Sequence, residues 1–501
     1  MATKLFKQNV ILSIIALIAG IQLPLTFAPF NVYVAAIISP ALLLATWVYT
    51  PPKQALLRGF LYGLGGFAAG LYWIYISVHT YGNAPLPLAF LLTGLLIAVL
   101  ALFPAAQGYL LVRFFSRNNL SKFLLAFPAS WVLFEWIRSW FLTGFPWLLL
   151  GYSQMSSPLR GFAPLVSVYG VSFLVALTAG AIVVPFVLRR LKPIIVTLLL
   201  IIIIWITGFW LTHQQWTQPQ GKPVSVALMQ GNIPQEMKWQ PNATHRILAD
   251  YEHLTKRYWP NDLVIWPEAA IPIFDWQAEH FLNIIQQKAK QNHATIILGI
   301  PIEDLKTSKY YNGMLALGLN NSRYLKRHLV PFGEYPFLSI ISEPFMKFFK
   351  IPMSGFTPGP KHQPPFIAAN MTIAPSICYE IAYPYEILHY LPKAQLLVNI
   401  TDDSWFGHSI AAAQQLEIAQ MRALETGRYL LAATNTGITA IIGPNGRVLN
   451  QAPIFQSMTL TGTVYAMTGA TPWVSFGYYM WLIITLLCLI AAVWRQYHIK
   501  K

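Results

Sequence analysis

The chain has 501 residues, enough for two or three domains, and it is 55% hydrophobic but only 10% charged. Soluble proteins carry about 25% charged residues, so this composition excludes an ordinary soluble protein and predicts a membrane protein. The net charge of +16 does not indicate nucleic-acid binding, because residues 222–447 are nearly balanced, with 19 Lys or Arg and 17 Asp or Glu. The basic excess lies beside apolar segments, where it sets membrane orientation.

Eight apolar stretches have roughly the length of a bilayer span. They lie at about residues 8–25, 31–50, 59–77, 87–112, 123–140, 162–188, 193–212 and 474–494. Because further spans follow the first stretch, it is interpreted as a signal anchor rather than a cleavable signal peptide. We therefore expect a membrane domain of seven transmembrane helices at 1–212, and an eighth helix with a cytoplasmic tail at 474–501.

The basic residues outside the balanced region predict the orientation of these helices. Thirteen of them fall at the termini or in every second connection: Lys4, Lys7, Lys53, Arg58, Arg113, Arg117, Lys122, Arg189, Arg190, Lys192, Arg495, Lys500 and Lys501. The alternate connections and their flanks hold only Arg138 and Arg160. Positive loops stay in the cytoplasm. This pattern predicts cytoplasmic termini and an external 213–473 region. An even number of spans requires both termini on one side of the membrane, so the two arguments agree.

Two charged residues near the end of the fifth apolar stretch, Glu135 and Arg138, need a separate interpretation. A packing pair or an interfacial anchor is the more common role for such residues, and a headgroup-binding site is the alternative.

The region 213–473 is expected to be an α/β domain, because short β-like runs alternate with helical ones. The expected strands are 224–231, 262–268, 294–300, 314–318, 324–330, 371–377, 395–401, 429–434, 438–443 and 458–464. The expected helices are 242–258, 276–291 and 411–427. The sequence GPNG at 443–446 is typical of a hairpin turn.

Cys378 is the first candidate for chemistry. It follows the apolar run MTIAPSI and precedes YEIAYP, which predicts a strand-to-helix turn that can present a nucleophile. A buried structural cysteine is the alternative, but an unpaired thiol outside the cytoplasm is a liability unless it has a use. The other cysteine, Cys488, lies in an apolar run, so a disulfide between the two is not expected.

Glu268 and Lys326 are the next candidates. Glu268 ends an expected strand in the sequence IWPE, where apolar neighbours should raise its pKa and suit it to proton transfer. Lys326 lies in YLKRHLVPFGEYPF, where strand alternation would turn either Lys326 or Arg327 inward. A buried cation can stabilise an oxyanion. The alternatives are a surface-loop glutamate and an exposed strand lysine.

The order IWPE, YLKRHLVPFGEY and SICYEIAYP resembles the Glu-Lys-Cys triad of the nitrilase, or carbon–nitrogen hydrolase, superfamily. This resemblance implies an α-β-β-α sandwich for residues 213–473. Further segments along nearly the whole chain resemble the apolipoprotein N-acyltransferase family. These are LTFAPF (25–30), GLYWIYISVH (70–79), FPASWVLFEWIRSW (127–140), TGFPWLLLGYSQ (143–154), PLVSVYGVSFL (164–174), YYNGMLALG (310–318), DDSWFG (402–407) and AQMRALETGRYLL (419–431).

The resemblance implies a two-step acyl transfer in the bacterial inner membrane, with the catalytic domain in the periplasm. A phospholipid, typically phosphatidylethanolamine, gives its sn-1 acyl chain to the cysteine, and the thioester then acylates the amine of a diacylglyceryl-cysteine lipoprotein. A thioester retains enough acyl-transfer potential for this step. The implied triad is Cys378 as nucleophile, Glu268 as base and Lys326 as oxyanion stabiliser. The implied supporting residues are Glu334, Trp239, Tyr379 and Glu380. No metal or organic cofactor is implied.

One segment departs from the family pattern. The family has Gly-Pro and then Gln-His after WFG, whereas this chain has Ala411-Ala412 and, in place of the histidine, Gln415. These positions lie outside the implied triad, so the departure concerns loop shape and substrate fit.

The apolar segment FMKFFKIPMSGF at 345–356 is a candidate membrane-touching lid over Cys378. Its lid candidates are Phe345, Phe348, Phe349 and Phe356. Aromatic side chains enter the headgroup boundary readily, and the two interleaved lysines favour lipid phosphates. A segment packed under the domain core is the alternative.

Two other classes of function compete with acyl transfer. A membrane-anchored amidase or nitrilase would use the same triad on a small amide, but one anchor would suffice for a soluble substrate. A transporter or non-catalytic scaffold would use the spans alone. Substrate-conducting bundles usually carry charged residues, which are nearly absent from these spans.

Overall fold

The computed structural model describes residues 2–117, 119–336 and 355–498. The chain divides into two compact units. Unit 1 comprises residues 1–75, 86–214 and 476–501, and unit 2 comprises residues 76–85 and 215–475. The short segment 76–85 therefore belongs with the large α/β region, although apolar helices of unit 1 precede and follow it in the sequence.

Unit 1 is helical. Its helices are α1 (Ala2–Gln22), α2 (Ala35–Thr46), α3 (Pro52–Leu71), α5 (Leu86–Phe114), α6 (Phe127–Arg138), α7 (Ala163–Leu188), α8 (Leu191–Leu211) and α16 (Tyr479–His498), with α4 (Trp73–Ile76) at the boundary to unit 2. Within the described ranges, five helices are long and apolar enough to cross a membrane. A sixth results if Pro52–Leu71 and Trp73–Tyr81, which are bent by 53°, count as one span. At 12 residues each, α2 and α6 are shorter than a regular span. The count of eight spans stays a prediction.

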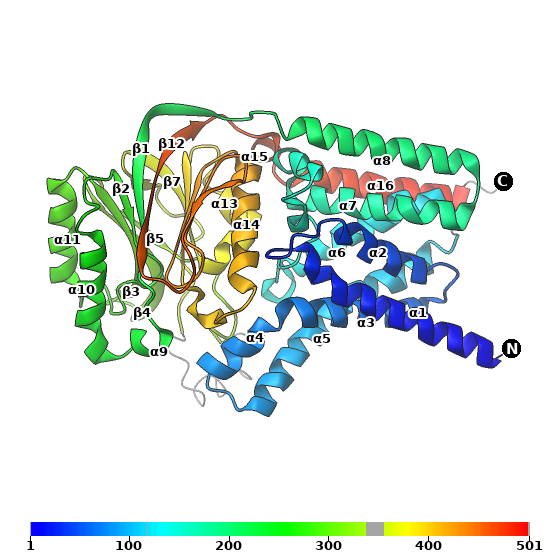
Figure 1. Cartoon of the computed structure of the whole chain (residues 1–501), viewed down its shortest axis with the longest axis horizontal. Helices are drawn as coiled ribbons and strands as arrows, with labels where there is room; N and C mark the ends of the chain where they lie inside the picture. Colours follow the sequence, from blue (N-terminus) through cyan, green and yellow to red (C-terminus); the bar gives the residue numbers. More distant parts are fainter. Residues whose placement is uncertain (1, 118, 337–354, 499–501) are drawn as a thin grey trace. The chain divides into compact units, whose positions relative to one another are not determined.

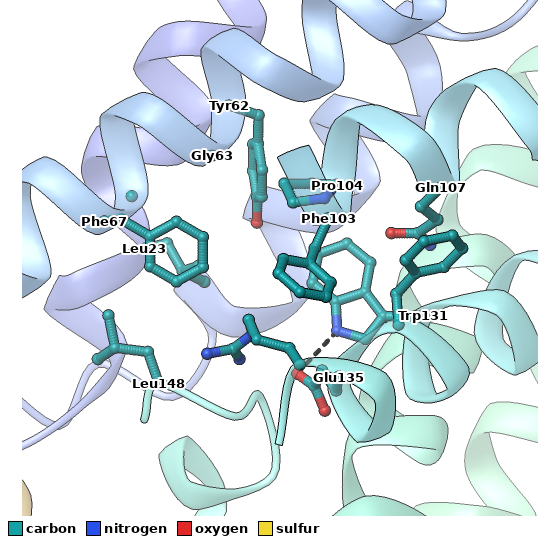
Figure 2. A pocket seen from close by; sticks show the side chains of 13 residues that line it. Leu23, Tyr62, Gly63, Phe67, Phe103, Pro104, Gln107, Trp131, Glu135 and Leu148 are labelled. Atoms are coloured by element: carbon teal, nitrogen blue, oxygen red, sulfur yellow. Dashed lines mark hydrogen bonds between the residues drawn. The ribbon is translucent and has the colours of Figure 1, made fainter. Parts of the chain in front are cut away.

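A small cavity of about 50 Å³ lies inside unit 1, lined in part by Glu135 and Arg138 (Figure 2). The Glu135 carboxylate accepts hydrogen bonds from Trp131 Nε1 at 3.0 Å and from the Leu150 N–H at 2.7 Å. Arg138 Nη1 donates to the carbonyls of Phe145, at 2.8 Å, and Trp147, at 2.7 Å. Both side chains thus hold the backbone that follows α6, which agrees with the packing role expected from the sequence.

Unit 2 contains two six-stranded sheets. The first has the order β12-β1-β2-β3-β4-β5, with β12 (Met458–Thr468), β1 (Gln218–Gln230), β2 (Leu263–Ile265), β3 (Thr295–Asp304), β4 (Lys309–Gly318) and β5 (Ser322–Leu325). The second has the order β11-β10-β9-β8-β7-β6, with β11 (Val448–Gln451), β10 (Ala440–Ile442), β9 (Leu430–Thr434), β8 (Leu396–Thr401), β7 (Met371–Ile377) and β6 (Phe366–Ala368). Parallel pairs β1–β2, β2–β3, β7–β8 and β8–β9 form the sheet centres.

The strand sequences explain why two sheets stack face to face. Along β1, Val226 and Leu228 belong to the apolar cluster shared with the second sheet, whereas Ala227 and Met229 belong to a second apolar cluster. Successive side chains point to opposite faces, so a strand that is apolar at every position must be covered on both sides. One cover is the other sheet. The other consists of helices, which gives four layers (Figure 1).

The outer helices cover one face of each sheet. Helices α10 (Thr244–Thr255) and α11 (Glu279–Gln291) contribute Ile247, Tyr251 and Ile285 to the cluster on the outer face of the first sheet. Helices α13 (Pro384–Leu388) and α14 (Ala411–Thr426) pack against the second sheet. This α-β-β-α sandwich confirms the fold expected for the α/β region.

Most strands and helices of unit 2 lie where the sequence predicted them, and the predicted hairpin turn at 443–446 joins β10 to β11. Strands β6 and β11 were not predicted. The predicted strand 324–330 is wrong beyond Leu325. The N–H groups of Arg327 and His328 donate to the Glu380 carboxylate instead of to a neighbouring strand.

Candidate active site

Glu268 lies three residues beyond the end of β2, in the interior of unit 2, with 7% of its surface exposed. Its Oε1 accepts a hydrogen bond from Asn312 Nδ2 at 2.7 Å and lies 3.4 Å from Lys326 Nζ. Its Oε2 accepts the backbone N–H of Asp402 at 2.9 Å. Three segments that are far apart in the sequence therefore fix the orientation of this carboxylate.

Lys326 directly follows β5, and its side chain is only 1% exposed. The Nζ atom donates to Glu334 Oε1 at 2.9 Å, a shorter contact than the one to Glu268. Burial alone would lower the pKa of Lys326, but the charges of Glu334 and Glu268 outweigh burial and raise it above its usual value. Lys326 is therefore a fixed, fully charged ammonium between two carboxyl groups.

Glu334 and Asn312 brace this arrangement. Glu334 Oε2 accepts the N–H of Val330 at 2.7 Å, which leaves Oε1 to face Lys326. The Asn312 amide group donates to both Glu268, at 2.7 Å, and Glu334, at 2.9 Å. The Asn312 side chain thus links the two carboxylates that both contact the Lys326 ammonium. Its role was missed from the sequence, although the YYNG segment that contains it had been noted.

Cys378 lies where β7 ends and the 3₁₀-helix η8 (Cys378–Ala382) begins, as the predicted turn requires. Its φ of 53° is in the left-handed region, which non-glycine residues seldom adopt outside constrained functional sites. Asn399 Nδ2, on the neighbouring strand β8, donates to the Cys378 carbonyl at 3.3 Å. Neither Cys378 nor Cys488 forms a disulfide.

The electrostatics of the site couple Cys378 to the two charged residues. Burial raises the pKa of the Cys378 thiol well above its usual value, Glu268 raises it further, and Lys326 opposes both effects. Burial also raises the pKa of Glu268, against the attraction of Lys326 and with the repulsion of Glu334. A neutral thiol beside a carboxylate of raised basicity is a suitable pair for proton transfer during attack on a carbonyl.

Glu380 joins the segment after β5 to the turn that carries Cys378. Its Oε1 accepts the Tyr324 hydroxyl at 2.8 Å and the N–H groups of Arg327, at 2.7 Å, and His328, at 3.1 Å. Its Oε2 accepts the Ile377 N–H at 2.8 Å. Because Lys326 precedes Arg327 and Cys378 follows Ile377, this one carboxylate sets the spacing between the cation and the thiol.

Lys238 and Asp402 form a second buried ion pair beside Glu268, which sequence reasoning missed. Lys238 Nζ donates to Asp402 Oδ2 at 2.5 Å and to the Glu268 carbonyl at 3.0 Å. Burial would raise the pKa of Asp402, but Lys238 outweighs burial and lowers it. Next to Lys238, at the end of α9 (Gln235–Lys238), Trp239 has a buried indole N–H with no hydrogen-bond partner among the described residues.

Asp403 is a further buried carboxyl group of the site. Burial, with repulsion from Asp402 and Glu268, raises the pKa of Asp403 well above its usual value. Its Oδ1 finds no hydrogen-bond partner in the described part of the chain. Asp403 also contributes to the raised pKa of Cys378, which places it near the thiol. The DDSWFG segment was noted from the sequence, but no role was assigned to either aspartate.

The remaining sequence candidates lie around this centre. The Tyr379 ring lies against His328 and Tyr383, with centroid distances of 6.0 and 5.1 Å. Gln415, one of the departures from the family pattern, lies in α14 and donates to Thr401 Oγ1 at 2.9 Å. Phe356 donates its backbone N–H to the Glu334 carbonyl at 2.9 Å. The other lid candidates, Phe345, Phe348 and Phe349, lie outside the described residues.

Comparison with known proteins follows the division of the chain. Residues 225–472 match the carbon–nitrogen hydrolase family, which is the class of protein that the paired sheets define. Residues 19–181 match the apolipoprotein N-acyltransferase N-terminal domain.

Relatives match nearly the full length of the chain. The chain is 49% identical to the apolipoprotein N-acyltransferase of Coxiella burnetii, over 93% of this chain and 96% of that protein. It is 44% identical to the enzyme of that name from Azotobacter vinelandii (92% and 90% covered) and 42% identical to that from Methylococcus capsulatus (93% and 92% covered). The chain belongs to the apolipoprotein N-acyltransferase family, and it is an acyltransferase enzyme. The competing amidase interpretation rests on the hydrolase fold alone.

Proposed function

We propose that this enzyme moves an acyl chain from a phospholipid to the N-terminal amine of a diacylglyceryl-cysteine lipoprotein, through a thioester on Cys378. The observation that carries the proposal is the buried Lys326 ammonium between the carboxyl groups of Glu268 and Glu334, with its charge acting on the Cys378 thiol. The acceptor follows from the names of the relatives, and phosphatidylethanolamine is the donor that the family resemblance implies.

In the first half-reaction, the Glu268 carboxylate takes the thiol proton while the Cys378 sulfur attacks the ester carbonyl of the phospholipid. The Lys326 ammonium stabilises the oxyanion of the tetrahedral intermediate, and its charge is already fixed before the reaction. The ester C–O bond then breaks, and the leaving alkoxide takes the proton from Glu268. The products are the thioester, a lysophospholipid and a Glu268 carboxylate ready for the second step.

In the second half-reaction, the neutral α-amine of the lipoprotein attacks the thioester carbonyl, and Glu268 accepts the amine proton. Lys326 again stabilises the oxyanion. The C–S bond breaks, the Cys378 thiolate takes the proton from Glu268, and the N-acylated lipoprotein leaves. Asn312 orients the Glu268 carboxylate, Glu334 holds the Lys326 ammonium, and Glu380 fixes the turn that carries Cys378. Trp239 and Tyr379 would shape the substrate pocket.

We further propose that the enzyme spans the bacterial inner membrane eight times, with a membrane domain at 1–212, a periplasmic catalytic domain at 213–473 and the last helix and tail at 474–501. Five long apolar helices among the described residues, and the bent pair, support a multi-pass membrane protein. The basic residues support cytoplasmic termini, since they favour the cytoplasmic side of a membrane.

Mass spectrometry of the purified protein tests the chemistry. After incubation with phosphatidylethanolamine vesicles, the peptide that contains Cys378 should carry one acyl group, and a diacylglyceryl-cysteine peptide should remove it. Cys378→Ala should yield no adduct, while the matched control Cys488→Ala, the only other cysteine in the sequence, should yield the normal one. Continued acyl transfer by Cys378→Ala would exclude the covalent mechanism.

A further inference from the structure

The segment 76–85 folds as part of the catalytic unit. It contains the π-helix η2 (Ser77–Tyr81), and π-helical turns occur frequently at functional sites. The segment closes on itself, because the Gly82 N–H donates to the Ser77 carbonyl at 2.9 Å and the His79 ring contacts the Ala84 carbonyl at 2.8 Å. Such a closed turn has a defined shape that a simple linker would not need.

The turn contacts the 3₁₀-helix η9 (Asp403–Phe406), which contains Trp405. Ser77 Oγ donates to the Trp405 carbonyl at 2.7 Å. The Tyr81 and Trp405 rings meet edge to face, with centroids 6.0 Å apart, which is a favourable aromatic geometry. One polar contact and one aromatic contact, four residues apart on the turn, therefore fix both the backbone and the ring of Trp405.

Trp405 lies in the same short loop as Asp402, whose backbone N–H donates to Glu268. The Asp402 N–H, three residues before Trp405, donates to Glu268 Oε2 at 2.9 Å. The Asp402 side chain caps the loop by accepting from Ser404 Oγ at 2.5 Å and from Asn435 Nδ2 at 3.1 Å. Trp405 lies three residues after Asp402, so few backbone dihedrals separate the contacts of the turn from the N–H that is donated to Glu268.

We propose that Ser77 and Tyr81 are positioning residues of the active site, which hold the loop of Trp405 and thereby the Asp402 N–H that hydrogen-bonds Glu268. The inference rests on the proposed role of Glu268 as the base of acyl transfer. Neither Ser77 nor Tyr81 touches the reacting atoms. They act through Trp405, and the carboxylates of Asp402 and Glu236 are close enough to Tyr81 to interact with it electrostatically.

The test compares Ser77→Ala, Tyr81→Phe and Tyr81→Leu by acylation from phosphatidylethanolamine vesicles and transfer to a diacylglyceryl-cysteine peptide. Tyr81→Leu loses the ring contact and should lower kcat on the order of tenfold while KM changes little, the scale expected for one aromatic pair. Tyr81→Phe keeps the ring and should restore most of the rate. Ser77→Ala should have a smaller effect in the same direction.

The pH profile separates positioning from general destabilisation. The charged or titratable groups around Glu268 are Lys326, Glu334, Asp402, Asp403, Cys378 and Lys238. Loss of the Asp402 N–H bond leaves the Glu268 carboxylate less stabilised, so the pKa of Glu268 rises and the acidic limb of kcat/KM moves to higher pH. Tyr81→Leu should show this shift, and Thr80→Ala, an exposed position on the same turn, should not.

A double-mutant cycle completes the test. Because Tyr81 acts through Trp405, Tyr81→Leu combined with Trp405→Leu should be no slower than Trp405→Leu alone. Additive effects of the two substitutions on the rate would overturn the inference. A wild-type rate with a wild-type acidic limb of kcat/KM in Tyr81→Leu would also overturn it, and so would a loss of activity no larger than the loss of folded protein. Absence of an acyl adduct on wild-type Cys378 is a different result, because it would refute the proposed function before any variant is compared.

Discussion

The ammonium of Lys326 lies 2.9 Å from the carboxylate of Glu334 and 3.4 Å from that of Glu268, its other ion-pair partner. The shorter contact of Lys326 is thus with Glu334 and not with the proposed base, Glu268. If Lys326 were paired with Glu268 alone, it would hold the pKa of that base low and weaken it. With two carboxyl groups for one cation, the pKa of Glu268 instead stays above its usual value, mainly through burial.

Replacement of either charged partner should affect the chemical step. Glu268→Gln removes the proton acceptor and Lys326→Met removes the oxyanion stabiliser. Each should reduce the rate by about 10²-fold or more, the scale of lost acid–base or oxyanion assistance. Single-turnover measurement of thioester formation and of transfer reports both steps. Normal rates of both steps in both variants would show that the assigned roles are wrong.

The pH dependence of kcat/KM should shift in opposite directions in two variants. Activity requires Glu268 as a carboxylate, so the acidic limb follows the pKa of Glu268, which burial raises above 4.5. Lys326→Met removes a charge that lowers the pKa of Glu268, and the limb should move to higher pH. Glu334→Gln removes a charge that raises it, and the limb should move to lower pH. Shifts in the same direction would contradict this electrostatic assignment.

Glu380 should be a structural requirement of the site. In Glu380→Gln, an NH₂ group replaces one of the two acceptor oxygens, so at least one backbone N–H loses its partner. We expect the free energy of unfolding to fall by about 1–3 kcal/mol, the usual cost of an unsatisfied buried group. Thermal denaturation in detergent measures the change. Tyr324→Phe removes a single hydroxyl contact and should reduce the free energy of unfolding by less. An equal reduction in both variants would contradict the proposed structural role of Glu380.

The orientation in the membrane has a direct measurement. Fusion of a phosphatase that is active only in the periplasm should give an active protein when the fusion follows about residue 300 and an inactive one after Lys501. The basic residues on the proposed cytoplasmic side favour this pattern. The reverse pattern would overturn the proposed topology.

The strand pattern was sufficient for the α/β class of unit 2, because runs such as MTIAPSI and QLLVNIT are largely apolar, as strands buried on both faces are. The sandwich arrangement was expected only from the resemblance to the nitrilase superfamily. The sequence did not predict that β5 ends at Leu325, just before Lys326. Beyond that point the Arg327 N–H donates to the Glu380 carboxylate instead of to a neighbouring strand. Glu380 lies 53 residues further along the chain, so no local pattern reveals this contact. Asn312, Lys238 and Asp402 were missed for the same reason, since their contacts to Glu268 join distant segments.

The placement of residues 76–85 within the catalytic unit limits how freely the enzyme can be recombined. The segment is encoded among the apolar helices, while its partner Trp405 is encoded more than 300 positions later. A chimera that joined the membrane helices of one relative to the hydrolase domain of another would pair a turn from one parent with a tryptophan loop from the other. The two halves therefore have to be inherited together, and a compensating change in one should accompany a change in the other.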